Sequence, residues 1–343
     1  MLAFTMVVLV AAALTAVWTP ARGADDDGVA AAARSGLHIG GAMSGYDAAW
    51  PDDPLLEIAV EHFSAVTAAA YMPWGAWPDP DQPVQTAGFD DVVAWASEHD
   101  LLVHGHTLVY PSQNARLDWW VELEDGHEAL LQHFVTQMAA SNAGDVWVWD
   151  VVNEVMAPDG SPADPWGLRR DVIEHEKIGP NYVDLAFRWA RAADPDALLI
   201  LNDYGAEERN PKSDRLFAYV QELRRRGVPI DGVGFQFHVN AVEGELDWES
   251  VRSNLERFAD AGFRVFITEL DVPVVALAAD EEPTSGDLER QRAVFEEVAR
   301  IATELDLVDS LLMWNYVDER SWLHPARNTL SENVVAGVYT HPT

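Results

Sequence analysis

Residues 146–154 read VWVWDVVNE and have the composition of a buried β-strand. The run from Val146 to Val152 is rich in β-branched and aromatic side chains, which favour strands. A buried strand usually ends in a polar turn, yet this one ends in Asn153 and Glu154 and then continues into apolar residues. A carboxyl group in that position makes the end of this strand a candidate for function.

Seven other runs of similar character occur along the chain, separated by longer amphipathic segments. The amphipathic segments include 89–100, 126–140, 181–194 and 214–227, and the last of them ends in an Arg triplet and a glycine, as a helix C-terminus should. The eight expected strands are 36–43, 63–70, 101–110, 146–154, 197–204, 232–239, 264–272 and 310–318. Eight strands, each followed by a crossover, in about 300 residues is the count of a (β/α)8 TIM barrel.

A doubly wound α/β sheet is the main alternative fold, and the sequence disfavours it. The glycines of GLHIGGAMSG (36–45) do not have the G-x-G-x-x-G spacing of a phosphate-binding loop. No linker or change in composition divides the rest of the chain. We therefore expect an α/β protein with a single TIM barrel over residues 25–343.

Residues 1–24 are expected to be a signal peptide or an N-terminal anchor. An apolar run from Leu2 to Val17 is long enough for a signal-peptide core and short for a membrane span, and small residues follow it. The positively charged start of a typical signal peptide is missing, so a retained anchor is the alternative. Either interpretation predicts a secreted or extracellular catalytic domain.

The composition excludes several classes of partner. The 343 residues include 57 Asp and Glu against 22 Lys and Arg, a net charge of −35, which disfavours binding to nucleic acid or anionic lipid. There are no cysteines, so disulfides and thiolate metal sites are excluded. Because 14 Trp, 12 Phe and 8 Tyr argue against disorder, we expect a folded protein with an acidic surface suited to high salt. An ordinary acidic secreted protein is the alternative.

Two glutamates stand at the ends of otherwise apolar strands. Active sites of TIM barrels form at the C-terminal ends of the strands, so Glu154 and Glu269 should face each other across the barrel mouth. A pair of carboxyl groups is what glycoside hydrolysis requires: one protonates the leaving oxygen and the other stabilises the anomeric centre. The structural alternative is that each glutamate pairs with an arginine at the barrel rim, but neither strand end has an adjacent arginine.

The motifs around these glutamates resemble those of glycoside hydrolase family 10, the family of retaining endo-β-1,4-xylanases. The matching segments, which occur in the order and spacing of the family, are WDVVNE (149–154), ITELDV (267–272), GHTLV (105–109), SQ (112–113), NDY (202–204), GFQFH (234–238) and MWNYVDERSW (313–322). The resemblance implies a glycosidase that cleaves β-1,4-linked xylan, or a related β-glycan, by double displacement. It implies no cofactor and no metal, a polysaccharide or oligosaccharide substrate, and a monomer.

The resemblance also implies roles for particular residues. Glu154 would be the general acid/base and Glu269 the nucleophile. The supporting residues would be Asn153, Gln236, His238 and Asp271, with His238 bonded to Glu269 and oriented by Asp271. The residues expected to bind substrate are His106, Tyr110, Gln113, Asn202, Tyr204, Trp314, Trp322 and Trp74. For the two C-terminal tryptophans and His106, an ordinary structural role is the alternative.

The chain departs from the family pattern in four places. The usual Glu-Asn and a following Lys, which bind the sugar one unit beyond the cleavage site, are replaced by Ala69, Ala70 and Pro73. Tyr110 and Pro111 replace a Trp-His pair. The two remaining departures are His104 for an arginine and Gly205 for an asparagine. We therefore expect weak xylanase activity or a different β-linked glycan.

Two other functions are consistent with the sequence. A metal-dependent barrel hydrolase could use His104 and His106, which point the same way on one strand, with Asp203, His238 or Asp318. A carbohydrate-binding protein without catalysis is the second, although binding alone needs neither glutamate.

Overall fold

Eight parallel strands close into a barrel in the computed structural model of the protein, which confirms the predicted (β/α)8 fold. The strands are β1 (His38–Met43), β2 (Ala65–Ala69), β3 (Leu102–Val109), β4 (Val148–Asn153), β5 (Leu198–Asp203), β6 (Gly232–Phe235), β7 (Arg264–Leu270) and β8 (Val308–Met313). Each strand pairs with the next one along the chain, and β8 pairs with β1 to close the barrel. The structure describes residues 36–43, 54–69, 77, 79–111, 117–158, 161, 163–239, 246–273, 284–314 and 316.

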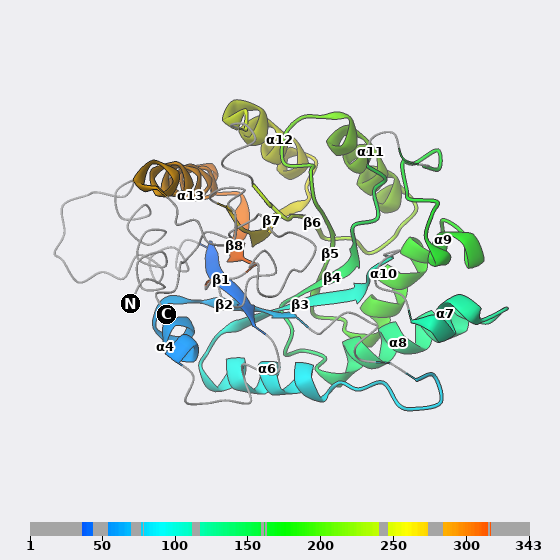
Figure 1. Cartoon of the computed structure of the whole chain (residues 1–343). Coiled ribbons are helices and arrows are strands. Elements are labelled where there is room, and N and C mark those ends of the chain that lie inside the picture. The colour runs from blue at the N-terminus through cyan, green and yellow to red at the C-terminus, as the bar shows by residue number, and fades with distance from the viewer. Residues whose placement is uncertain are drawn as a thin grey trace.

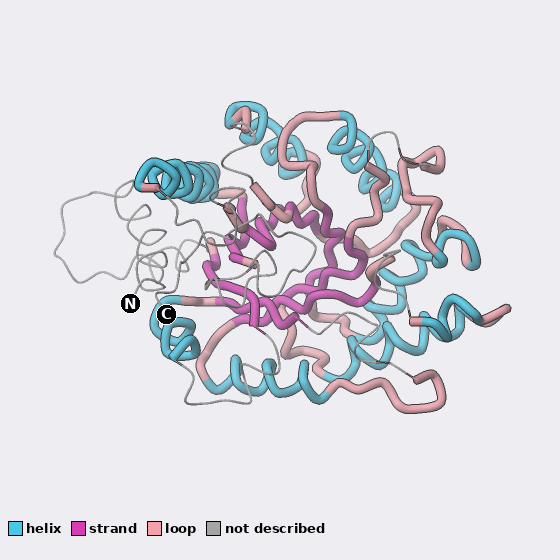
Figure 2. The backbone as a smooth tube through the Cα atoms, in the orientation of Figure 1, coloured by secondary structure: helices cyan, strands magenta, loops and turns pink. Residues whose placement is uncertain are grey.

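Helices surround this ring of strands (Figures 1 and 2). Those described are α4 (Pro54–His62), α6 (Ala87–Glu98), α7 (Asp118–Glu122), α8 (His127–Ser141), α9 (Ile173–Lys177), α10 (Tyr182–Ala193), α11 (Pro211–Arg225), α12 (Trp248–Asp260) and α13 (Ser285–Leu305). The predicted 214–227 helix begins three residues earlier, because Pro211 occupies its first turn and the Asn210 side chain caps it by accepting from Ser213 N at 2.8 Å.

Strand β4 shows how the alternating sequence builds the barrel. The indole of Trp149 points outward to the helices, where it stacks on Phe89 with ring centroids 5.1 Å apart. Val148 lies on the opposite face and packs with Ile200 and Phe266 of other strands, inside the barrel. Asp150 shares the parity of Val148, so its carboxylate also points inward, toward the C-terminal end. The same alternation that fills the core therefore brings a charged group into the barrel.

All eight strands are shorter than their predicted ranges, and β6 and β8 show the clearest differences. β6 ends at Phe235 rather than 239, since Phe237 adopts a positive φ of 58° and its N–H is turned to the carboxylate of Glu207 at 3.1 Å. His238 still makes one parallel bridge, with Asp271, beyond the end of the strand. β8 starts at Val308, two residues before the predicted start, and ends at Met313.

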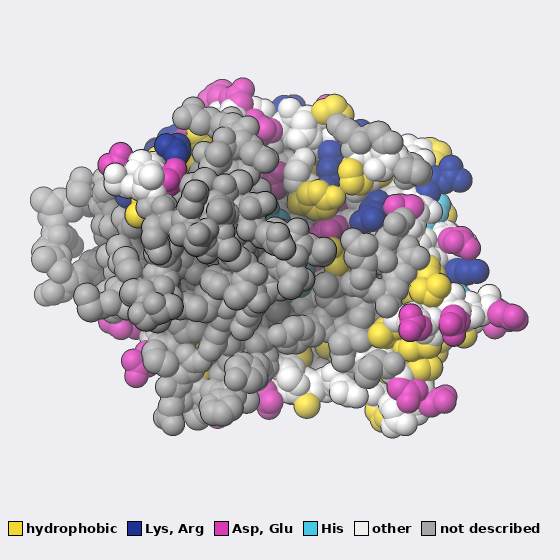
Figure 3. All heavy atoms as spheres, viewed as in Figure 1, with side chains coloured by type: hydrophobic (Ala, Val, Ile, Leu, Met, Phe, Trp, Pro, Cys, Tyr) yellow, Lys and Arg dark blue, Asp and Glu magenta, His cyan; other side chains and the backbone are white. Residues whose placement is uncertain are grey.

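On the coloured part of the surface in Figure 3, acidic side chains are scattered rather than gathered in one patch. In the described part of the chain, no helix combines the length and apolarity needed to cross a membrane. The predicted signal peptide or anchor, residues 1–24, lies outside the described residues.

Candidate active site

The two glutamates singled out by the sequence lie at the C-terminal ends of β4 and β7. Glu154 follows the last residue of β4, and its backbone has a positive φ of 55°, which is uncommon for a residue other than glycine. Its N–H donates to the carbonyl of Asn202 at 2.8 Å, which ties this turn to the neighbouring strand β5. Glu269 is the penultimate residue of β7 and is 4% exposed. The two carboxyl groups also interact electrostatically, since Glu269 raises the pKa of Glu154.

Side-chain amides connect the two glutamates. The Asn202 Nδ2 group donates to Glu269 Oε1 at 2.6 Å and to Asn153 Oδ1 at 3.0 Å. Gln236 Nε2 donates to the same Asn153 oxygen at 3.1 Å and to Glu154 Oε1 at 3.2 Å. The side-chain oxygen of Asn202, Oδ1, accepts from Thr268 Oγ1 at 2.7 Å. Each carboxylate therefore has a fixed donor on the protein side.

Asn202 is one of the residues that the sequence grouped with those expected to bind substrate. It is fully buried, and its amide donates to Glu269 and Asn153 rather than toward the mouth. A side chain at Gly234 would put its Cβ 2.4 Å from Asn202 Oδ1, so that glycine makes room for the amide. The contacts of Asn202 are those of a residue that positions the glutamate.

One imidazole approaches Glu269 from β6. His238 Nε2 lies 3.3 Å from Glu269 Oε2, and its Nδ1 lies 2.9 Å from Asp271 Oδ1. Burial alone would lower the pKa of His238, but the Asp271 and Glu269 carboxylates outweigh it and hold that pKa well above its usual range. The cationic His238 therefore places a positive charge 3.3 Å from the Glu269 carboxylate.

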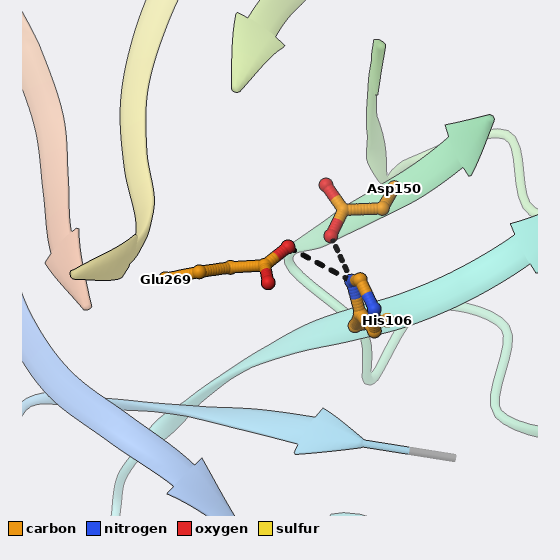
Figure 4. A group of neighbouring side chains, drawn as sticks. All are labelled: His106, Asp150 and Glu269. Atoms are coloured by element: carbon orange, nitrogen blue, oxygen red, sulfur yellow. Dashed lines mark hydrogen bonds and ion pairs between the residues drawn. The ribbon is translucent and has the colours of Figure 1, made fainter. Parts of the chain in front are cut away.

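A second imidazole approaches Glu269 from β3 (Figure 4). His106 Nδ1 lies 2.7 Å from Asp150 Oδ2 and 3.8 Å from Glu269 Oε1. Burial works against its charge, but Glu269 and Asp150 raise the pKa of His106. Asp150 is held from its other side by His104 Nε2 at 2.9 Å. Although burial opposes ionisation, the two imidazoles lower the pKa of Asp150 to about 2.

The acid and base groups of these residues could also hold a metal ion. His106, Asp150 and Glu269 each offer one ligand atom, all within 4.8 Å of one another, and they are the one such group among the described residues. The metal-hydrolase alternative needs His104 and His106 to bind one ion together. In the structure, both imidazoles instead contact the Asp150 carboxylate. Asp203 is engaged elsewhere, by Lys212 Nζ at 2.7 Å and by the Met156 N–H at 2.9 Å. Asp318 lies outside the described residues.

Glu154 has a different environment from Glu269. Burial raises its pKa first, and the negative charges of Glu269 and Asp203 add to that effect. Hydrogen bonds from Tyr110 and Gln236 work in the opposite direction, with the Tyr110 hydroxyl 2.8 Å from Glu154 Oε2. The net shift is upward, which favours a protonated Glu154.

Aromatic side chains border the same end of the barrel. Trp314 follows β8, and its ring lies edge-on to His106 with centroids 4.8 Å apart. The ring of Tyr204, after β5, is half-buried and has the Lys212 ammonium 3.5 Å from its centroid. Three other residues expected to bind substrate, Trp74, Gln113 and Trp322, lie outside the described residues.

Sequence reasoning missed two residues of this site, Asp150 and Thr268. Asp150 carries a signal that could have found it, because an aspartate in the middle of the run VWVWDVV needs a buried partner. Thr268 carries none, since a threonine is ordinary in a strand. Tyr110 was expected to bind substrate, and its contact with Glu154 was not foreseen.

Comparisons with known proteins agree with this geometry. The model of glycosyl hydrolase family 10 matches residues 29–335. Endo-1,4-beta-xylanase B of Thermotoga neapolitana is 33% identical over 296 residues, which cover 84% of this chain and 80% of that protein. Endo-1,4-beta-xylanase C of Paenibacillus barcinonensis is 31% identical, but the match covers 80% of this chain and only 26% of that longer protein.

Solved structures show the same likeness. Xylanase 10B from Thermotoga petrophila RKU-1, in complex with xylobiose, superimposes with a TM-score of 0.79 at 30% sequence identity, covering 92% of each chain. Native xylanase 10B from Thermotoga maritima gives a TM-score of 0.77 at 31% identity, covering 90% of this chain and 91% of that one. The chain therefore belongs to glycosyl hydrolase family 10 and is a glycosidase that hydrolyses O-glycosyl bonds.

Proposed function

We propose that this barrel hydrolyses β-1,4-linked xylan, or a closely related β-glycan, with retention of anomeric configuration. The observation that carries the proposal is the contrast between the two glutamates. Burial and negative neighbours favour a protonated Glu154, whereas Glu269 lies beside the cationic His238 and accepts a hydrogen bond from the Asn202 amide. Two carboxyl groups in such different surroundings, one among negative groups and one beside a cation, are suited to act as an acid and a nucleophile.

In the first step, a carboxylate oxygen of Glu269 bonds to the anomeric carbon as the glycosidic C–O bond breaks. The proton of Glu154 goes to the departing oxygen, so the leaving group is released as an alcohol and Glu154 becomes a carboxylate. In the second step, Glu154 takes a proton from water, the water oxygen bonds to the anomeric carbon, and the ester bond to Glu269 breaks. The sugar keeps its configuration and both glutamates return to their starting states.

The substrate class rests on relatives that are themselves named endo-1,4-beta-xylanases and on a similar structure solved with xylobiose. In this chain, His106 and Trp314 would form the wall for the sugar at the cleavage site, since a flat indole suits the C–H face of a sugar ring. Asn153 would donate to the sugar 2-hydroxyl, a contact that strengthens in the transition state. Tyr204, Gln113, Trp74 and Trp322 would complete the sugar sites.

The setting of the enzyme is also part of the proposal. The apolar segment 2–17 supports export, and the dispersed acidic surface supports activity in high salt, where screening reduces the repulsion between carboxylates. We expect a monomer that acts on an extracellular polysaccharide.

Product release from xylan and from aryl β-xylosides, β-glucosides and β-cellobiosides tests the proposal, at low salt and at molar salt. We expect turnover of xylan or aryl xylosides that disappears in Glu269→Ala, with higher activity and a higher melting temperature in molar salt. Binding of glycan without turnover of any substrate would contradict the enzyme and leave a carbohydrate-binding barrel. The loss of turnover after chelation, restored by added metal, would instead favour a metal-dependent hydrolase.

A further inference from the structure

Among the described residues, Tyr110 makes the shortest side-chain hydrogen bond to the carboxyl group of the candidate acid/base. It directly follows β3, and its hydroxyl donates to Glu154 Oε2 at 2.8 Å. The two residues come from neighbouring strands, whose pairing is shifted between His106 and Val109 before Val109 pairs with Val152. This shift sets which side chain of β3 meets the end of β4, so the contact depends on a local irregularity of the barrel.

Tyr110 lies among apolar side chains. It forms part of the wall of a small cavity, together with Trp77, Trp119, Trp120 and Phe134. Trp120 is itself fixed, since its Nε1 donates to the buried carboxylate of Glu174 at 3.1 Å. The residue after the tyrosine is the buried Pro111, whose ring restricts the backbone. The proline restricts the backbone at Tyr110, and the hydrogen bond to Glu154 places its hydroxyl.

The two oxygens of Glu154 have different partners. Oε1 accepts from the amides of Gln236 at 3.2 Å and Asn153 at 3.4 Å, whereas Oε2 accepts from Tyr110. An amide N–H can only donate, but a phenol can donate to a carboxylate and can also accept from a carboxylic acid. Tyr110 is therefore able to stay bonded to Oε2 in both protonation states of Glu154.

None of the other ionisable groups coupled to Glu154 donates a hydrogen bond to its Oε2 among the described residues. Glu269 on β7 and Asp203 on β5 are both negative and favour the protonated form of Glu154. His106 on β3 couples to Glu154 electrostatically, but its hydrogen bond goes to Asp150. Tyr204 also couples to Glu154 electrostatically, and its ring faces Lys212. Tyr110 thus provides the hydrogen bond that opposes burial most strongly.

We propose that Tyr110 is a positioning residue of the acid/base, which fixes Glu154 Oε2 and favours the ionised carboxylate that the second step needs. Double displacement requires Glu154 in both states: protonated while the leaving group departs, and ionised while water attacks. Burial and negative neighbours serve the first state, and the tyrosine hydroxyl serves the second. The inference deepens the proposed function and rests on Glu154 being the acid/base.

Tyr110→Phe tests the inference, since it removes the hydroxyl and keeps the ring. Without the donor, the pKa of Glu154 should rise, so the alkaline limb of kcat/KM should move upward by about one pH unit. With an activated aryl β-xyloside, the second step should slow by about tenfold and the glycosyl-enzyme should accumulate as a pre-steady-state burst. A merely structural role would change the melting temperature or KM and leave the alkaline limb where it was.

Tyr219→Phe is the matched control, because it removes another buried phenol, on α11 at the outside of the barrel. It should leave the pH profile unchanged. A direct titration of the Glu154 carboxyl by carbon-13 NMR, assigned with Glu154→Gln, makes the test independent of turnover. An unchanged titration midpoint in Tyr110→Phe, or an unmoved alkaline limb, would overturn the inference. Absence of turnover in the wild type, with a shifted carboxyl titration in Tyr110→Phe, would overturn the proposed function and leave the contact supported.

Discussion

The two sides of the barrel mouth differ in what their strands present. On β3 to β7, the strand ends and the residues just beyond them carry imidazole, carboxyl and amide groups that bond to one another. On β2, the sequence is AVTAA, and its last residue, Ala69, pairs in register with His106 of β3. Thr67 is buried, and its hydroxyl makes no hydrogen bond within the described part of the chain. One side is polar and highly connected, and the neighbouring strand is almost entirely apolar.

This difference separates chemistry from recognition. The groups that would break and form bonds come from β4 and β7 and are supported from three other strands. The family resemblance assigns the β2 side to sugar binding, yet Ala69, Ala70 and Pro73 occupy the positions of its polar residues there, the latter two outside the described residues. With the proposed roles, this barrel would keep its catalytic groups while the residues expected to select the substrate have changed.

After the complete loss expected for Glu269→Ala, the largest effect should come from Glu154, also on the polar side. Glu154→Ala should lower kcat/KM on xylan by about 10²- to 10⁴-fold, the contribution of a positioned acid/base. Azide should restore turnover of an activated aryl β-xyloside and give the β-glycosyl azide, because the small anion occupies the space of the missing base. In Glu269→Ala, azide should instead attack the opposite face and give the α-glycosyl azide. If the two variants gave each other's product, the assigned roles would be reversed.

Asp271 should have a smaller effect, with a dependence on pH. In the wild type, Asp271 and Glu269 raise the pKa of His238 against burial, so His238 stays cationic through neutral pH. Asp271→Asn should lower that pKa, so the cation and its support of Glu269 are lost as pH rises through the new value. We expect kcat/KM to fall by about tenfold on the alkaline side, the equivalent of one charge-assisted hydrogen bond, and to change little in acid.

Asp309→Asn is the matched control for that variant. Asp309 pairs with Arg264 at the opposite end of β7. Its replacement should leave the pH profile as it is. Equal losses at every pH in Asp271→Asn would show that the aspartate acts on the fold rather than through the imidazole.

The smallest effect should come from the apolar side, when the substrate gains a second sugar. An aryl β-xylobioside should be only a few-fold better than the aryl β-xyloside in kcat/KM, since each absent polar contact forgoes about 1 kcal/mol, or roughly fivefold. Extending the substrate on the leaving-group side provides the control, because that side lies away from β2. A gain of several hundredfold in kcat/KM for the xylobioside would show that the β2 side binds the second sugar strongly, which would contradict the expected loss of polar contacts there.

The barrel could be predicted from the sequence because each strand is a short apolar run with polar residues at one end. Such a pattern is local, so it does not depend on which strands become neighbours. It did not predict where β6 ends, since the positive φ of Phe237 arises from the distant carboxylate of Glu207. Likewise, the contact of Tyr110 with Glu154 depends on a shifted register between β3 and β4. The apolar run before Glu154 and Glu269 predicts that each lies at a strand end. The hydrogen-bond partners of Asn202 and Asp150 lie on other strands, so they depend on the relative positions of those strands in the barrel.

The buried pair of Lys212 and Asp203 has a practical consequence for attaching the enzyme to a surface. The sequence contains only one other lysine, Lys177 on α9, whose side chain is 34% exposed, compared with 6% for Lys212. Amine-reactive reagents need a free, accessible ammonium group, and arginine does not react with them at neutral pH. Coupling through lysine side chains is therefore confined to one position on an outer helix, and the α-amino group is the amine that competes with it.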